Sequence, residues 1–434
     1  MAVTGTKLTL QDVLGNWRKL GTLFSLQIAH DLPGALTATM APTLFVKQFG
    51  MPLEYIGLFF IPFVVTALKW TWAPMVDNHS LARIGHRKSW LAPLTVMVCV
   101  SFLLIANVEP SLDTLYLIIG LLVVKQVFFA TQEIAADAYV IENLEQQERG
   151  IGASVVWLGK EFGQVIGFAG LLYIADHYGW GAAFTGVAIL FAVFNLPALL
   201  REEPGRVINE AMPRAEPLTF FRHRVNWKIV SIVFAMAFTL QMPVAIIGPF
   251  LGAKGFTISE IGVILGIAAS LGAIISLSIA SVIITRLGPK RTAIMLIFVA
   301  PLATPGFFWI AIHDSVSLSV VVGIVLWATI CTAPIRMVLY AARIGWTSDH
   351  QVGTDMTIQQ SVWFLGYAAS GALSGLLAGA VGWVGFFVVN IVLTAAALVY
   401  FISSHDRVEA EVETLRQALQ ENHAAGAAAA PTDG

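Results

Sequence analysis

Charged residues are scarce in this chain of 434 residues, of which 12% are Asp, Glu, Lys or Arg. A soluble domain carries roughly twice that charged fraction. Hydrophobic residues make up 57% of the chain. Apolar runs of about twenty residues, the length of a membrane-spanning helix, recur along it. The composition excludes an ordinary soluble protein and predicts one embedded in lipid.

Reactive side chains are almost as scarce. Cys99 and Cys331 both fall in apolar runs, where a lone cysteine is a small core residue. The nine histidines are scattered without metal-ligand spacing, so we predict no metal and no cofactor. The chain has no Gly-rich phosphate loop, no paired His and Asp at a loop and no Gly-flanked serine nucleophile. We therefore expect no enzyme, with a membrane-embedded transferase as the alternative of a different class.

The apolar runs predict about twelve membrane helices, six on either side of a polar segment. We divide the chain into an N-terminal six-helix half at 1–200, a connector at 201–225, a C-terminal half at 226–402 and a partly disordered tail at 403–434. The predicted helices span 18–46, 54–75, 89–107, 112–141, 151–175, 181–200, 226–251, 259–285, 292–312, 316–344, 354–379 and 381–402.

Lysine and arginine gather in alternate loops. If the amino terminus lies inside, only Lys47 and Lys254 fall in outer loops. This asymmetry predicts a bacterial inner-membrane protein with both termini in the cytoplasm.

A short basic loop occurs twice between apolar runs, as Arg83–Lys88 and, 203 residues further on, as Arg286–Arg291. Gly179-Trp180 recurs at the same offset as Gly382-Trp383. A duplicated helical half is the usual build of a secondary transporter. We predict an all-α membrane protein whose two halves are related by pseudo-two-fold symmetry.

The first basic loop also contains the candidate gating residues. We expect Asp77 with Arg83, Arg87 and Lys88 to latch the inner ends of helices, because such ion pairs form and break between states.

Ionisable residues inside membrane helices cost about 2.5–3.5 kcal/mol each on insertion scales and are functional candidates by default. Only one of them, Arg336, falls in the second half. Those within the predicted helices are Asp31, Lys69, Lys125, Glu133, Asp137, Lys160, Glu161 and Arg336.

Glu133 and Asp137 lie one helical turn apart, on one face. Two carboxylates so close repel, which favours one of them holding a proton, as a proton carrier must. The alternative is a structural ion-pair network with Lys125 or Lys160. Lys69 is expected to extend toward the cytoplasmic interface.

The duplicated register places Arg336 opposite Glu133, 203 residues away. Arg336 is therefore a candidate pair for Glu133 across the halves, or a clamp for an anionic group, with a structural salt bridge as the alternative. Asp31 and Gln241 lie in helices interrupted by Pro and Gly, which point to a central site. Asp31 is also counted with Glu133 and Asp137 as a candidate proton-coupling residue, with capping of polar backbone as its alternative role.

Further candidates for substrate contact are polar and aromatic residues of the same helices. Rings could stack on an aryl group, although packing and interface anchoring are commoner roles for them. These candidates are Gln132, Tyr139, Trp157, Lys160, Glu161, Tyr340 and Trp363.

The loop pattern of Asp77 and residues 83–88 resembles that of the major facilitator superfamily. Lys69–Asp77, Ala130–Tyr139 and Glu148–Gly152 are similar to the branch of AmpG-type muropeptide permeases, acetyl-CoA transporters and RhtX/FptX siderophore importers. Asp77-Asn78-His79 with Arg87–Trp90 looks most like the siderophore importers.

The resemblance implies a monomeric, proton-coupled importer that works by alternating access, with an iron–siderophore complex as the expected cargo. The alternatives are a muropeptide permease and a drug or metabolite exporter of the same fold. No nucleic-acid partner is expected.

Overall fold

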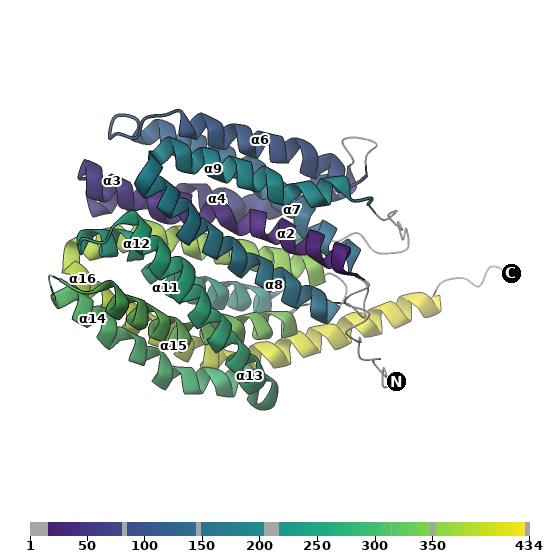
Figure 1. Cartoon of the computed structure of the whole chain (residues 1–434). Helices are drawn as coiled ribbons and strands as arrows, with labels where there is room; N and C mark the ends of the chain where they lie inside the picture. Colours follow the sequence, from purple (N-terminus) through teal and green to yellow (C-terminus); the bar gives the residue numbers. More distant parts are fainter. Residues whose placement is uncertain are drawn as a thin grey trace.

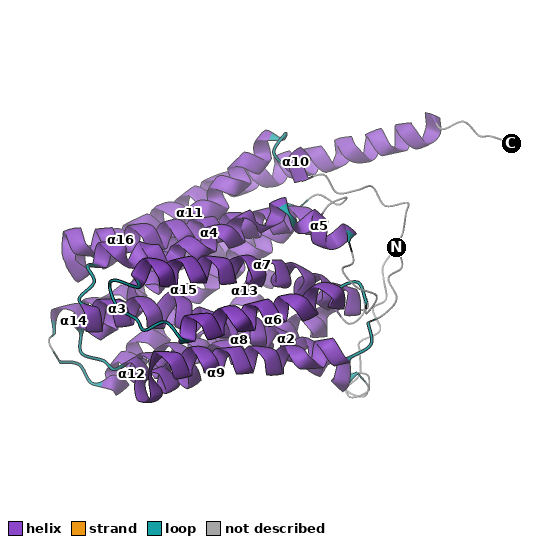
Figure 2. Ribbon diagram, turned by 90° about the horizontal axis from the view of Figure 1, so that it is seen from above, coloured by secondary structure: helices purple, strands orange, loops and turns teal. Residues whose placement is uncertain are grey.

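The computed structural model describes residues 16–79, 85–144, 149–203, 217–313, 315–347 and 352–429, and the regular structure in these ranges is helical (Figures 1 and 2). The elements of the first half are α2 (Trp17–Gly34), η1 (Ala35–Met40), α3 (Ala41–Phe49), η2 (Leu53–Phe60), α4 (Ile61–Leu68), η3 (Lys69–Thr71), α5 (Ala73–Asn78), α6 (Lys88–Ala106), α7 (Leu115–Asn143), α8 (Arg149–Val165), η4 (Ile166–Leu171) and α9 (Leu172–Leu200). Those that follow are α10 (Pro217–Phe220), α11 (Arg224–Ala253), α12 (Ile258–Val263), η5 (Ile264–Ala268), α13 (Ala269–Val299), η6 (Ala300–Ala303), α14 (Thr304–Ile312), α15 (Leu318–Gly345) and α16 (Val352–Ala429).

Three long helices turn back on themselves at a glycine. Gly179 in α9, Gly288 in α13 and Gly382 in α16 have φ of 85°, 79° and 69°, a left-handed backbone that a residue with a Cβ rarely adopts. All described residues with positive φ are glycines, and they fall into pairs 203 to 205 residues apart. These pairs are Gly50 with Gly255, Gly85 with Gly288, and Gly179 with Gly382.

By length and composition, eight helical stretches of the described chain could cross a membrane. Three of them, Val155–Leu200, Ile258–Ile312 and Thr354–Gln417, contain one of the glycine turns and therefore cross twice. Together with the continuous helical stretch Trp17–Phe49, these give the twelve crossings predicted from the apolar runs.

Figure 1 shows the elements of the first half, in purple to teal, lying beside those of the second half, in green to yellow. The first turn of α2 and the last turns of α16 point toward the same end of the bundle, which we call the terminal end. The opposite end, where α3, α12 and α14 lie in Figure 1, is called the far end.

The two halves pack closely at the far end. A Cβ on Gly375 of α16 would lie 1.9 Å from the carbonyl oxygen of Leu53, and one on Gly248 of α11 would lie 2.4 Å from the hydroxyl of Thr43. The Nζ of Lys47 donates to the carbonyl of Phe256 over 2.7 Å. Small residues allow backbones to approach this closely, so the halves meet without a gap at these points.

The end of the chain continues the last membrane helix. The tail was expected to be partly disordered from residue 403, but α16 runs from the Gly382 turn to Ala429 without a further break. Val408 and Val412 are buried against Phe401 in an apolar cluster, which holds this extension to the second half.

Candidate functional site

The membrane-embedded charges of the first half begin with an ion pair. The Nζ of Lys69 in η3 lies 2.8 Å from Oε2 of Glu133 in α7, and the two side chains are 5% and 18% exposed. Lys69 also lies 5.8 Å from the ring centre of Phe364 in α16. The expectation that Lys69 extends to the interface was therefore wrong, because a carboxylate on the neighbouring helix neutralises it where it stands.

This pair replaces the one that the duplicated register suggested. Glu133 binds Lys69 rather than Arg336, and no ion pair joins Glu133 to Lys125 among the described residues. Lys125 is instead held by Oε1 of Gln126 at 2.6 Å and lies over the rings of Phe102 and Phe129. The aromatic faces attract its charge where no carboxylate does.

Gln132, next to Glu133, points into the first half. The Nε2 of His30 lies 2.8 Å from Oε1 of Gln132, and Nε2 of Gln132 donates to Oδ1 of Asn195 over 2.8 Å. Gln132 has no exposed surface. This chain of hydrogen bonds ties α2, α7 and α9 together. The sequence prediction missed His30 and Asn195 as its members, since neither residue belongs to a charged pattern.

Lys160 of α8 is surrounded by carboxylates. Its ammonium interacts electrostatically with Asp31, Asp137 and Glu133 of the same half, and with Tyr340 of α15 in the other half. Asp137 is exposed, and Tyr340 is 39% exposed.

Arg336 of α15 interacts electrostatically with Glu161 of α8 and with Tyr367 of α16. Glu161 is 8% exposed, whereas Arg336 is exposed. No ion pair of Arg336 is found among the described residues, and the carboxylate that acts on its charge from the other half is Glu161 and not Glu133. A cation that is open to water while facing the opposite half can accept an anionic group.

The remaining candidates lie in different surroundings. Tyr139 is 1% exposed and packs with Trp90 in an apolar cluster, so it fills the core of the first half. Trp157 of α8 is 45% exposed, and Trp363 of α16 packs against the second apolar core. Gln241 of α11 is 8% exposed, and its Oε1 has no hydrogen-bond partner among the described residues.

Arg87 is the centre of the loop cluster. Its Nη1 lies 2.7 Å from Oδ1 of Asp77, and its Nη2 lies 2.7 Å from Oε1 of Glu142 at the end of α7. Burial by itself lowers the pKa of Arg87, but the hydrogen bonds to Glu142 and Asp77 raise it overall, so the guanidinium stays charged. Arg83, which we expected in this cluster, lies outside the described residues.

Glu203, just after α9, closes the cluster from another side. Its carboxylate accepts hydrogen bonds from the backbone N–H groups of Arg87 at 2.8 Å and Lys88 at 3.0 Å, at the start of α6. Lys88 thus joins the cluster through its backbone. The sequence prediction missed Glu142 and Glu203, because both lie far along the chain from the loop.

One group of possible metal ligands occurs in the described chain. Ligand atoms of His405, Asp406 and Glu409 lie within 4.8 Å of one another on α16. Asp406 already forms an ion pair with Lys290, and both carboxylates are exposed. We therefore assign no metal to this group.

Residues 23–342 match the family model described as Major Facilitator Superfamily. The chain is 25% identical over 398 residues to a transporter of Rickettsia felis named AmpG 4, which covers 88% of this chain and 95% of the relative. It is 23% identical over 402 residues to the anhydromuropeptide permease of Escherichia coli K12, which covers 89% of this chain and 80% of that permease.

Solved structures share the fold at low sequence identity. A bacterial homologue of the human lysosomal transporter Spinster, in an inward-facing and occupied conformation, superposes with a TM-score of 0.67 at 13% identity. It covers 92% of this chain and 98% of its own. The nucleoside transporter NupG gives a TM-score of 0.66 at 13% identity, with coverage of 89% and 98%.

Proposed function

Since the chain belongs to the Major Facilitator Superfamily, and is thus a multi-pass membrane transporter of small molecules and not an enzyme, we propose that it imports a muropeptide-like solute in symport with protons. Support for this cargo comes from the two relatives, an AmpG transporter and an anhydromuropeptide permease, which are similar along nearly nine-tenths of the chain. Neither is named as a siderophore importer, so the predicted siderophore cargo gains no support from them.

The observation that carries the proposal is Arg336, an exposed cation that faces Glu161 across the two halves. A muropeptide joins a sugar to a short peptide and therefore carries carboxylates. Guanidinium binds carboxylate in a two-pronged geometry, which makes Arg336 the anchor for the cargo. Lys160 on the opposite side offers a second cation, and Tyr340 beside it offers a hydroxyl.

Proton exchange falls to the carboxylates around Lys160. Glu133 is neutralised by Lys69, whereas Asp31 and Asp137 both act on the single ammonium of Lys160. Two negative charges beside one positive charge favour retention of one proton. We assign the exchangeable proton to Asp31, with Glu133 as a residue that positions Lys69.

The charges at the two ends of the bundle support an orientation for the proposed import. Arg87, Arg201, Arg224 and Lys290 lie at the terminal end, and this basic character favours the cytoplasmic side of a bacterial inner membrane for that end. The close packing at the far end then describes a state that is shut toward the outside. A transporter in this state would release its cargo into the cytoplasm.

Uptake of labelled anhydromuropeptide into cells that lack their own permease tests the proposal. Arg336→Gln should reduce uptake by about a hundredfold, as expected when a charge-assisted contact with the cargo is lost, while Arg336→Lys keeps part of it. Arg291→Gln, which changes an exposed loop arginine, is the matched control. Iron-loaded siderophore forms a second arm of the same assay. Uptake of siderophore but not muropeptide would replace the proposed cargo, and unchanged uptake by Arg336→Gln would remove Arg336 from the site.

A further inference from the structure

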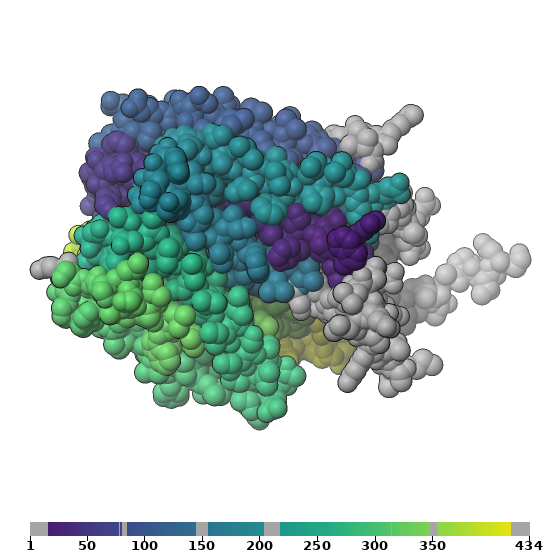
Figure 3. All heavy atoms as spheres, viewed as in Figure 1, coloured from purple at the N-terminus to yellow at the C-terminus, as the bar shows by residue number. Residues whose placement is uncertain are grey.

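A second basic site lies at the terminal end, on the outer side of the bundle. A concave pocket between the start of α2 and the end of α9 is lined by Trp17, Arg18, Gly21, Thr22, Pro197, Leu200 and Arg201. Figure 3 shows the first turns of α2, in purple, at the surface between the teal helices α8 and α9. The pocket is separate from the charges that surround Lys160.

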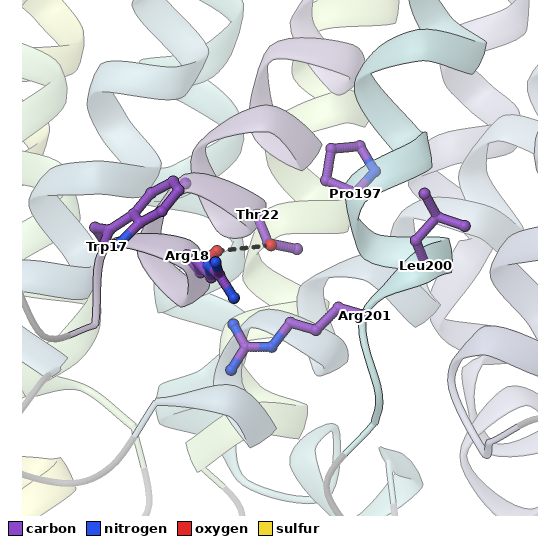
Figure 4. Close-up of a pocket in the computed structure, with 7 residues that line it drawn as sticks. Trp17, Arg18, Thr22, Pro197, Leu200 and Arg201 are labelled. Atoms are coloured by element: carbon purple, nitrogen blue, oxygen red, sulfur yellow. Dashed lines mark hydrogen bonds between the residues drawn. The ribbon is translucent and has the colours of Figure 1, made fainter.

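Two arginines meet in this pocket without a counter-charge. Figure 4 shows the guanidinium groups of Arg18 and Arg201 turned toward one another. No ion pair of either arginine is found in the described part of the chain, and Nη1 of Arg201 is buried without a hydrogen-bond partner. Two like charges that converge around a buried unpaired donor are stabilised when an anion lies between them.

The rim of the pocket is apolar and aromatic. Leu200 is 73% exposed and ends the membrane-spanning stretch Val155–Leu200, and Trp17 is 63% exposed and begins α2. Tryptophan is enriched at the boundary between lipid and water, and basic residues there attract anionic headgroups. A small soluble anion would make no use of this rim, whereas the acyl chains of a lipid would cover it.

We propose that Arg18 and Arg201 bind the phosphate of an anionic phospholipid, whose acyl chains pack along Leu200 and Trp17. The hydroxyl of Thr22 is already used, since it donates to the carbonyl of Arg18 over 2.8 Å. The charged contacts therefore come from the two guanidinium groups. The lipid would bridge the start of α2, in the first crossing, and the end of α9, in the sixth. It would thus hold two helices of the first half together.

Native mass spectrometry of the full-length protein, released from detergent with defined lipids, tests this site. The expected result is that adducts of phosphatidylglycerol fall by about tenfold in Arg18→Gln/Arg201→Gln, because each basic residue contributes to binding an anionic headgroup. The charge-matched control is Arg222→Gln/Arg224→Gln, two exposed arginines at or just before the start of α11 that do not line the pocket. Equal loss in both double variants would overturn the site.

A second variant that fills the pocket tests the site even if the double arginine variant folds poorly. An added Cβ on Gly21 has no atom within 4 Å, so Gly21→Phe should fold and fill the pocket while both arginines stay. Adducts of phosphatidylglycerol should fall in this variant too. Inorganic phosphate and phosphatidylcholine are the comparison arms. If inorganic phosphate competes at equal concentration, the pocket takes a free anion and the lipid assignment is wrong; if phosphatidylcholine binds equally well, anionic recognition is wrong.

Discussion

The two basic loops occupy equivalent places in the duplicated frame, yet they are built differently. The side chain of Arg87 in the first loop is 5% exposed and forms ion pairs with Asp77 and Glu142. Lys290, 203 residues later, has a side chain that is 36% exposed and pairs with Asp406. Asp406 lies 203 residues after Glu203 and so occupies the equivalent position in the second half. The carboxylate of Glu203 accepts a hydrogen bond from the backbone N–H of Arg87.

The two loops share the same backbone turn but differ in the number and burial of their ion pairs. Gly85 and Gly288 both have positive φ, so the chain reverses in the same way in each half. The buried arginine joins α5, α6 and α7 with the end of α9, whereas the lysine joins one loop to the extension of α16. At the basic loop itself, the first half is thus tied together by a network of ion pairs, and the second half by one exposed ion pair among the described residues.

The first half also has a buried ion pair within the membrane, between Lys69 and Glu133. We expect the largest loss of stability when this pair is broken. Lys69→Met leaves the carboxylate of Glu133 largely buried and without its cation, which should cost about 3 kcal/mol of unfolding free energy. Denaturation of the purified protein in detergent measures this loss. Adding Glu133→Gln to Lys69→Met should restore most of the stability, because both charges are then gone. A double variant no more stable than the single one would mean that the pair does not act as a unit.

Arg87→Gln should cost less, about 2 kcal/mol, because its partners Asp77 and Glu142 are 47% and 36% exposed and water can solvate them. The same denaturation measurement checks this value. Arg87→Lys should lose about half as much, since one ammonium cannot satisfy both carboxylates in the geometry of a guanidinium. If Arg87→Gln lost as little stability as Lys290→Gln, the two loops would not differ in their contribution to stability.

Lys290→Gln should have the smallest effect, below about 1 kcal/mol, because exposed ion pairs contribute little. Its loss of stability should also shrink as salt is added, since screening acts on exposed charges more than on buried ones. Parallel denaturation at low and high ionic strength gives the answer. A Lys290→Gln loss that equals that of Arg87→Gln would show that the two loops are equally strong.

The residues that the sequence identified best are those with a local physical signature. The glycines of the repeat were found as a spacing, and each one at a helix break indeed adopts positive φ. The charged residues were found because ionisable groups are rare in apolar runs. Their partners were predicted less well: Glu133 was matched with Arg336 by register, while the structure matches it with Lys69.

Length, hydropathy and spacing by themselves determined that this chain lies in a membrane, crosses it twelve times and repeats one half. Each of these properties depends on residues near one another in the chain. Only the tertiary structure decided which charges meet, that Glu161 faces Arg336 and that Arg18 meets Arg201 at the surface. The rotation of each helix about its axis selects these contacts. That rotation is set by packing against neighbours such as the close approach of Gly163 to α2, which no local pattern records.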